Sequence, residues 1–190
     1  MDRHTDPRIE RTNLAFEQAI LELSAQRPIS RITVAELAER AGATRATFYN
    51  RYNSPLELLI QVLATDLDRG HAIEARQRAQ GELSAAELLR LATCGVIEHV
   101  ERFQPIYRHA LSDPADTGVY DALVRHFAAY SIAFIARCTH PDRPRAHHEL
   151  VAQFVANGFA GVIKACLADD SVSKQDLADA VISCVPAWWS

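Results

Sequence analysis

The sequence predicts an all-α fold, and three features support this prediction. Glycine and proline are scarce, with 7 and 8 residues in a chain of 190. Between these turn-forming positions, apolar residues recur with the 3.6-residue period of a helix rather than the two-residue period of a strand. Several predicted helices also begin at recognisable capping residues. The expected helices span about residues 8–25, 34–41, 45–51, 55–79, 84–102, 104–112, 116–139, 144–168 and 173–186.

Two helix starts carry the spacing of a capping box. Thr33 is followed by Glu36, so Thr33 is expected to cap a helix that begins at residue 34. Ser54 and Glu57 repeat this spacing, and Pro55 stands between them at the first helical position. Proline is tolerated there because its missing N–H group would have no partner within the helix.

The segment 33–52 predicts two short helices joined by a tight turn. Gly42 directly follows an apolar stripe and can adopt the left-handed backbone that ends a helix, and Thr44 is expected to cap the next helix. On that second helix, Phe48 and Tyr52 lie four residues apart and are expected to pack inward. The remaining outer face has few acidic groups and many hydrogen-bond donors. A helix of this kind fits the major groove of DNA, where Arg can bridge guanine and Asn can bridge adenine.

Charge is unevenly distributed along the chain. The net charge is −4, but residues 1–53 carry 8 Lys or Arg against 7 Asp or Glu, whereas residues 54–190 carry 12 against 17. An acidic chain is a poor partner for nucleic acid as a whole, yet its first quarter escapes the acidic excess. Only the N-terminal region is therefore compatible with binding to DNA.

The run ITVAELAERAGATRATFYNRY at residues 32–52 closely resembles the TetR family of transcription regulators, and the match extends over about residues 11–59. The resemblance implies a nine-helix TetR-like architecture, with a three-helix DNA-binding helix-turn-helix domain at residues 1–53. Residues 54–190 would form the larger effector-binding and dimerisation domain, with the helix 55–79 as connector. The residues that the resemblance places in contact with DNA are Thr33, Thr44, Arg45, Ala46, Thr47, Tyr49, Asn50 and Arg51.

Within this set, the resemblance implies that Arg45, Ala46 and Asn50 face bases. One position departs from the family pattern, because Pro55 stands where family members commonly have a lysine. The phosphate contact that this lysine makes in the family is then lost, or it passes to the backbone N–H groups capped by Ser54. We therefore expect operator binding that is weaker and less dependent on salt.

The C-terminal region resembles the family more weakly. A pattern around Phe154, Gly158 and Gly161 is similar to a subgroup that includes regulators of dihydroxyacetone-kinase operons. The helix predicted at 144–168 is apolar around most of its circumference and must be covered on both sides. Gln153, Asn157 and Lys164 interrupt it, which disfavours a membrane span.

We expect the last two helices of each of two subunits to form a four-helix interface, which would place two recognition helices one DNA turn apart. The residues expected at this homodimer interface are Phe154, Gly158, Gly161, Val162, Leu177, Val181, Ile182 and Val185. The alternative is that these side chains close the core of their own subunit. A palindromic operator in double-stranded DNA is the expected partner of the dimer.

A pocket for a small-molecule effector is expected between the helices at 84–102, 104–112, 116–139 and 144–168. The candidate lining residues are Cys94, Phe103, Tyr107, Tyr120, Phe127, Tyr130, Phe134 and Phe154. Apolar side chains with a few polar groups are typical of ligand pockets. Aromatic residues at helical spacing are equally typical of a core, so both interpretations stay open.

The sequence predicts no catalytic residue, no metal site and no cofactor, and hence no enzyme. The six histidines from His99 to His148 form neither Glu-x-x-His nor His-x-x-x-His pairs, and the four cysteines form no Cys-x-x-Cys pair. The N-terminus has no apolar segment typical of a secretory signal, so a cytoplasmic protein is expected.

The function predicted is that of a homodimeric, ligand-responsive DNA-binding regulator, most simply a repressor released by a small-molecule effector. Two other classes stay open: a helical carrier or enzyme that does not bind DNA, and a helical adaptor that acts through protein contacts. The adaptor hypothesis leaves the low-acid face around Arg45 and Arg51 unexplained.

Overall fold

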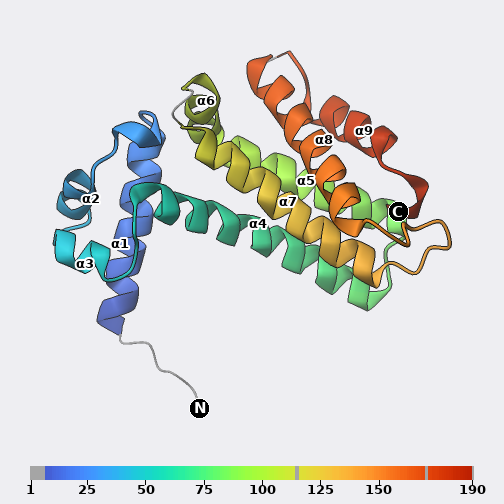
Figure 1. Cartoon of the computed structure of the whole chain (residues 1–190), viewed down its shortest axis with the longest axis horizontal. Helices are drawn as coiled ribbons and strands as arrows, with labels where there is room; N and C mark the ends of the chain where they lie inside the picture. The colour runs from blue at the N-terminus through green and yellow to red at the C-terminus, as the bar shows by residue number, and fades with distance from the viewer. Residues whose placement is uncertain (1–6, 114–115, 170, 190) are drawn as a thin grey trace. The chain divides into compact units, whose positions relative to one another are not determined.

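The computed structural model describes residues 7–113, 116–169 and 171–189, and within these ranges the chain is helical with no β-strand (Figure 1). The predicted all-α class is therefore confirmed. The α-helices are α1 (Pro7–Ser24), α2 (Val34–Arg40), α3 (Arg45–Tyr49), α4 (Pro55–Gln80), α5 (Ala85–Arg102), α6 (Gln104–Ser112), α7 (Thr117–Arg137), α8 (His148–Ala168) and α9 (Lys174–Cys184). Two short 3-10 helices, η1 (Ile29–Arg31) and η3 (Ala187–Trp189), were not predicted.

Two helix boundaries differ clearly from the prediction. Helix α8 begins at His148 rather than at residue 144, because the backbone of His147 is left-handed, with φ of 57°. Helix α9 ends at Cys184, and Val185 is extended. Pro186 explains this second boundary, since the residue before a proline is disfavoured in the helical conformation.

The chain forms two compact units. As far as the structure describes them, residues 1–63 and 105–119 make up the first unit, and residues 64–104 and 120–190 make up the second. Contacts therefore group residues 54–63 and 105–119 with the N-terminal helices. The domain boundary expected at residue 53 instead places both segments in the C-terminal domain, and this boundary stays a prediction.

The first unit has an aromatic core beneath its short helices. Phe16 on α1 and Phe48 on α3 are both fully buried, with their rings edge to face and their centroids 5.4 Å apart. Tyr52 is also buried and packs against both rings. As expected, Phe48 and Tyr52 face inward, and this packing leaves the opposite side of α3 free.

The turn between α2 and α3 has the predicted geometry. Gly42 has φ of 61°, a left-handed conformation that suits glycine. Its N–H donates to the carbonyl of Glu39 at 3.1 Å, and the N–H of Ala43 donates to the carbonyl of Ala38 at 2.8 Å. These two bonds are those of a Schellman motif, which satisfies the last carbonyl groups of α2.

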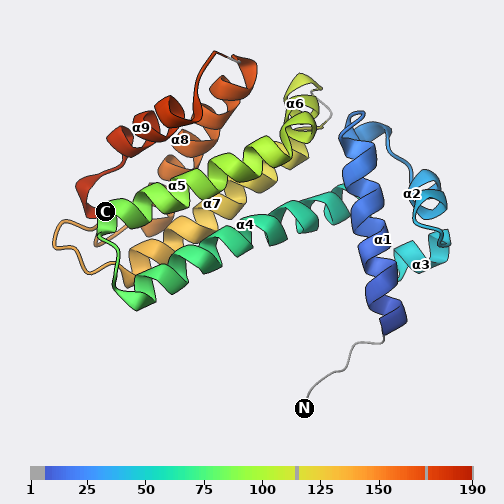
Figure 2. The same cartoon turned by 180° about the vertical axis from the view of Figure 1, so that it is seen from behind.

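The second unit packs α9 against both α5 and α8 (Figure 2). One core cluster contains Ile97, Leu177, Ala178 and Val181. Another joins α5, α7 and α8 to the C-terminal turn, where the ring of Trp189 stacks on that of Phe134 with centroids 4.5 Å apart. Trp189, the last described residue, is thus held in the core of this unit.

Candidate functional site: an exposed recognition helix and an aromatic pocket

Helix α3 exposes one continuous polar face. Phe48 is its only buried residue among Arg45–Tyr49. The side chains of Arg45, Ala46, Tyr49 and Asn50 are exposed, and 59% of Tyr49 is accessible to solvent. Residues 41–56 contain no Asp or Glu. The face therefore offers donors and positive charge without a nearby acidic group in the sequence.

Three further predicted DNA-contact residues are partly engaged in local bonds. The hydroxyl of Thr44 accepts from the N–H of Thr47 at 3.1 Å and caps α3. Thr33 caps α2 in a complete capping box with Glu36. The guanidinium of Arg51 donates to the carbonyl of Thr47 at 3.2 Å. These bonds fix the helix ends beside the exposed face, and Thr33 and Thr44 remain exposed.

Helix α4 begins at Pro55 with the predicted serine cap. The N–H of Glu57 donates to the hydroxyl of Ser54 at 3.1 Å. The carboxylate of Glu57 does not return to Ser54; it accepts from the backbone N–H and the side-chain amide of Asn53, at 3.0 and 2.7 Å. Pro55 itself is uncharged, so the first residue of α4 offers no cation where the family pattern has a lysine.

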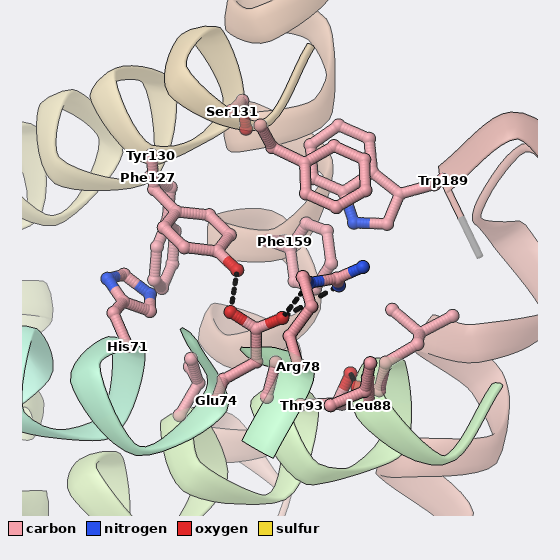
Figure 3. A pocket seen from close by; sticks show the side chains of 14 residues that line it. His71, Glu74, Arg78, Leu88, Thr93, Phe127, Tyr130, Ser131, Phe159 and Trp189 are labelled. Carbon is pink, nitrogen blue, oxygen red and sulfur yellow. Dashed lines mark hydrogen bonds and ion pairs between the residues drawn. The ribbon is translucent and has the colours of Figure 1, made fainter. Parts of the chain in front are cut away.

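The second unit contains an aromatic pocket with one buried carboxylate (Figure 3). Its volume is about 40 Å³. The lining residues come from α4, α5, α7, α8 and η3: His71, Glu74, Arg78, Leu88, Leu89, Ala92, Thr93, Val96, Phe127, Tyr130, Ser131, Phe134, Phe159 and Trp189.

Glu74 is the charged centre of this pocket, with only 1% of the residue exposed. Its carboxylate accepts from Arg78 Nε at 2.8 Å and from the hydroxyl of Tyr130 at 3.1 Å (Figure 3). A carboxylate removed from water is strongly unfavourable unless it is paired and hydrogen-bonded. These contacts meet that requirement and tie α4 to α7.

Cationic side chains and aromatic rings alternate at one end of the pocket. The guanidinium groups of Arg78 and Arg137 each lie 5.5 Å from the ring centroid of Phe134. Arg137 also lies 5.5 Å from the centroid of Tyr130 and 4.0 Å from the Glu74 carboxylate. A ligand here would meet ring faces and edges together with a few fixed polar groups.

Burial shifts the pKa values of titratable groups in the pocket and directly beside it. Burial, together with nearby His126, lowers the pKa of His71 to about 4. Burial likewise lowers the pKa of His126. Tyr130 is shifted in the other direction, since burial and the neighbouring Glu74 raise its pKa to about 12. Near neutral pH the two imidazoles and the phenol are therefore uncharged.

The structure brings together three of the predicted pocket residues, Phe127, Tyr130 and Phe134, around this cavity. The other candidates do not line it. Cys94 packs against the cluster around Ile97, and Phe103 lies edge-on to the buried ring of His99.

The remaining three candidates are also placed elsewhere. Tyr107 is buried in the first unit, and Tyr120 lies near Lys164, whose amine is 6.0 Å from its ring centroid. Phe154 faces solvent with 82% of the residue exposed. Aromatic residues at helical spacing thus divide between pocket, core and surface according to which face of each helix is packed.

Sequence reasoning missed the polar centre of the pocket. Glu74 continues the stripe of buried residues Leu59, Leu63 and Leu67 along α4. A carboxylate on an apolar stripe, with an arginine one turn later at residue 78, is the signal that could have identified it. Such a residue must find a buried partner, although the sequence does not show that Tyr130 supplies it.

An apolar face of α8 is exposed in the single chain. Leu150 and Phe154 are 69% and 82% exposed, and a Cβ added at Gly158 or Gly161 would meet nothing within 4 Å. Helix α8 is long and apolar enough to span a membrane, with 28% of its most apolar window buried. Length and composition alone are weak evidence for a span.

The other predicted interface residues, which lie on α8, on α9 and directly after α9, are placed differently. Leu177 and Val181 are buried in the core of their own unit, where they pack with Ile97 on α5. Val162, Ile182 and Val185 are partly buried against the same unit. For Leu177 and Val181 the structure therefore supports the alternative that these side chains close the subunit core.

Comparison with known proteins matches the N-terminal sequence to a regulator family. Residues 18–62 match the family described as "Bacterial regulatory proteins, tetR family". This segment contains α2, α3 and the turn between them. A search of the curated proteins found no match to the sequence.

Solved structures of similar fold cover almost the whole chain. A putative TetR-family transcriptional regulator from Rhodococcus sp. is 19% identical, with a TM-score of 0.67 over 95% of this chain and 100% of that chain. FadR from Thermus thermophilus, a TetR-family repressor in complex with lauroyl-CoA, is 20% identical, with a TM-score of 0.64 over 90% of each chain.

The dihydroxyacetone kinase operon activator DhaS is 12% identical, with a TM-score of 0.60 over 90% of this chain and 92% of that chain. At this identity the likeness shows the fold, so membership of the subgroup stays a prediction. The matching family and these structures are described as regulators and not as enzymes. Residues 18–62 are therefore similar in sequence to the tetR family, and the fold over most of the chain is that of the solved TetR-family structures.

Proposed function

We propose that the protein is a homodimeric, effector-responsive transcription regulator whose α3 helix reads a palindromic operator. The observation that carries this proposal is the two-sided character of α3. Phe48 is fully buried against α1, whereas Arg45, Ala46, Tyr49 and Asn50 are exposed in a segment without acidic residues. A helix anchored in this way can enter the major groove as a rigid element.

Each exposed side chain suits a particular contact. Arg45 can bridge the O6 and N7 atoms of guanine, and Asn50 can bridge adenine. Ala46 can contact a thymine methyl group. Among the remaining candidates, hydroxyl and guanidinium donors suit phosphate oxygens or base edges: Thr33, Thr44, Thr47, Tyr49 and Arg51.

A second copy of the chain is the proposed partner of the exposed face of α8. Leu150, Phe154, Gly158 and Gly161 are spaced by four, four and three residues and fall on one side of the helix. The glycines permit close approach of another helix, and Phe154 supplies a large apolar side chain. Burial of this face in a two-fold dimer also presents two recognition helices to the two halves of a palindrome.

The effector is proposed to bind in the aromatic pocket around Glu74. The volume of about 40 Å³ holds only a few water molecules, and typical ligand sites measure about 300–1,000 Å³. An effector must therefore displace lining side chains. We propose a compact, mainly apolar molecule with a polar group that reaches Glu74 or Arg78. A ligand that binds only the widened pocket shifts the protein toward that conformation, as release from the operator requires.

With operator reading, dimerisation and effector binding combined, the proposed protein is a cytoplasmic repressor. It leaves the operator when the effector binds. The proposal is tested by selection of bound fragments from random duplex DNA at a stated moderate salt concentration. We expect a palindromic motif with half-sites about one helical turn apart. Enrichment of no motif, with purified protein that is folded by circular dichroism, would overturn the DNA-reading role and favour a small-molecule carrier.

A further inference from the structure

Three metal-ligating side chains converge beside the pocket. Asp68 and His71 lie three residues apart on α4, and His126 projects from α7 in the same unit. One candidate ligand atom from each of the three lies within 4.8 Å of the other two. Spacing in the sequence predicted no metal site, because this set is assembled from two helices that are distant in the sequence.

His126 has an unusual environment for a buried imidazole. Its Nε2 atom is buried and has no hydrogen-bond partner among the described residues. The nearest carboxylate oxygen, Oδ1 of Asp68, is 3.8 Å away, which is too long for a hydrogen bond. A buried polar atom without a partner calls for an explanation, and an ion that is not part of the chain is one such explanation.

The two histidine rings are held in place by stacking. The ring of His71 stacks on Tyr130 with centroids 3.8 Å apart and on His126 with centroids 5.1 Å apart. The Asp68 side chain, in contrast, is 70% exposed. Two stacked imidazoles and one exposed carboxylate form a set that can close around an ion.

We propose that Asp68, His71 and His126 bind a divalent transition-metal cation of the zinc class. Two imidazole nitrogens and one carboxylate oxygen suit Zn²⁺, Co²⁺ or Ni²⁺, whereas Mg²⁺ and Ca²⁺ prefer oxygen ligands. Ligand atoms about 2.0–2.1 Å from a tetrahedral ion lie roughly 3.4 Å apart. The present separations of up to 4.8 Å therefore require the ligand atoms to come closer together by about an ångström.

The location of the site gives the ion a chemical role. Three protein ligands leave the fourth tetrahedral position for water or another donor. His71 also lines the aromatic pocket. The cation would tie α4 to α7 at the edge of that pocket, where a donor atom of a bound molecule could take the open position.

The test uses the full-length protein, stripped with a chelator and dialysed, and titrated calorimetrically with Zn²⁺. Co²⁺ absorption serves as a second readout, since its visible bands report tetrahedral coordination. The variants are Asp68→Asn, His71→Asn and His126→Asn. The matched control is His147→Asn, because His147 is exposed and outside the cluster, and its left-handed backbone tolerates asparagine.

We expect one zinc per chain in the wild type and the control, and binding weakened at least about tenfold in each cluster variant. Zinc affinity equal to that of the wild type in all three cluster variants would overturn the proposal, as would absence of zinc binding in the wild type. Loss of zinc binding only in His147→Asn would also overturn the proposal, because it would place the ion at His147. Asp68 lies on the surface, so Asp68→Asn decides the outcome even if a histidine variant fails to fold. The readout involves no DNA and is independent of the proposed regulator function.

Discussion

The carboxylate of Asp116 caps the 3-10 helix that begins at Ile29, although the two residues are 87 positions apart. Oδ2 accepts from the N–H of Ile29 at 2.7 Å, and Oδ1 accepts from the N–H of Ser30 at 2.9 Å. The residue before this helix, Pro28, supplies no side-chain cap. Asp116 is 2% exposed and thus replaces a local cap from a distant segment of the same unit.

Asp116→Ala is therefore expected to lower the free energy of unfolding by about 1–3 kcal/mol, because it leaves two backbone N–H groups without their acceptor. Asp116→Asn should recover part of this loss, since its carbonyl can accept from one of them. Urea denaturation followed by circular dichroism measures the change. The control is Asp121→Ala, which removes an exposed carboxylate on α7. Equal stability of Asp116→Ala and the control would contradict the capping role of Asp116.

Arg45→Ala is expected to weaken specific operator binding by about 1–3 kcal/mol and to relax the choice of base at one position. The reason is that a bidentate contact to guanine carries sequence information, whereas a phosphate contact does not. Fluorescence anisotropy with the selected operator and its single-base variants measures both effects. Arg76→Ala, at an exposed position of α4, is the charge-matched control. An unchanged base profile for Arg45→Ala would remove it from base reading.

Phe154→Asp is expected to convert the proposed dimer into monomers without loss of the fold. Phe154 is 82% exposed in the single chain, so a charge there disturbs no subunit core but prevents an apolar interface. Sedimentation equilibrium measures the mass. Ile73→Asp introduces the same charge at an exposed apolar residue of α4 and should leave the dimer intact. A monomeric wild type, or a dimeric Phe154→Asp, would argue against this interface.

Tyr130→Phe is expected to lower the free energy of unfolding by about 1–2 kcal/mol. The substitution removes the hydroxyl that donates to the buried carboxylate of Glu74 at 3.1 Å. Thermal or urea unfolding measures the loss. Tyr49→Phe removes a hydroxyl from an exposed ring and should be nearly neutral for stability. If the two substitutions had equal effects, the hydrogen bond to Glu74 would contribute nothing measurable.

The stability of the protein should fall as the pH decreases from about 6.5 to about 4, in part through His71. Its pKa of about 4 in the folded chain lies below the ordinary value of 6.5. In this window the unfolded chain binds a proton that the folded chain does not bind, so acidification favours unfolding; below about pH 4 this contribution levels off. His71→Gln removes the effect.

The corresponding measurement compares unfolding of the wild type and His71→Gln in chelator-treated buffer at about pH 7.5 and about pH 5. At the lower pH, the free energy of unfolding of His71→Gln should rise relative to that of the wild type. Titratable groups that do not interact with His71 behave alike in both proteins and cancel in this comparison. A difference that stays constant with pH would show that His71 titrates normally in the folded chain.

The recognition segment could be predicted closely because its structure depends on neighbours in the sequence. Thr33 and Glu36 form the expected capping box, and Gly42 takes the left-handed turn between two helices. Such interactions span three or four residues and form in the same way wherever the segment is placed. The helical period of α3 likewise predicts that Phe48 faces inward and that the other side of the helix is exposed.

The pocket could be predicted only in part. Phe127, Tyr130 and Phe134 share one face of α7, as helical spacing indicates, and all three line the cavity. Glu74 is 56 residues from the tyrosine that it binds, and no local rule pairs the two. Phe154 illustrates the converse, since its apolar character indicated burial in the pocket or interface, and in the single chain it faces solvent.

The sequence by itself determined the class of fold, the capped helix starts at residues 34, 45 and 55, and the turn between α2 and α3, because helix propensity, caps and turns act over a few residues. Only the tertiary structure decided which apolar faces are covered and which polar groups meet. Packing of α9 on α5 buries Leu177, whereas Phe154 on α8 stays exposed. The rings of His71 on α4 and His126 on α7 meet in the same way, through the packing of their helices. Such pairs depend on the simultaneous packing of several helices, and periodicity along one helix carries no information about its partner.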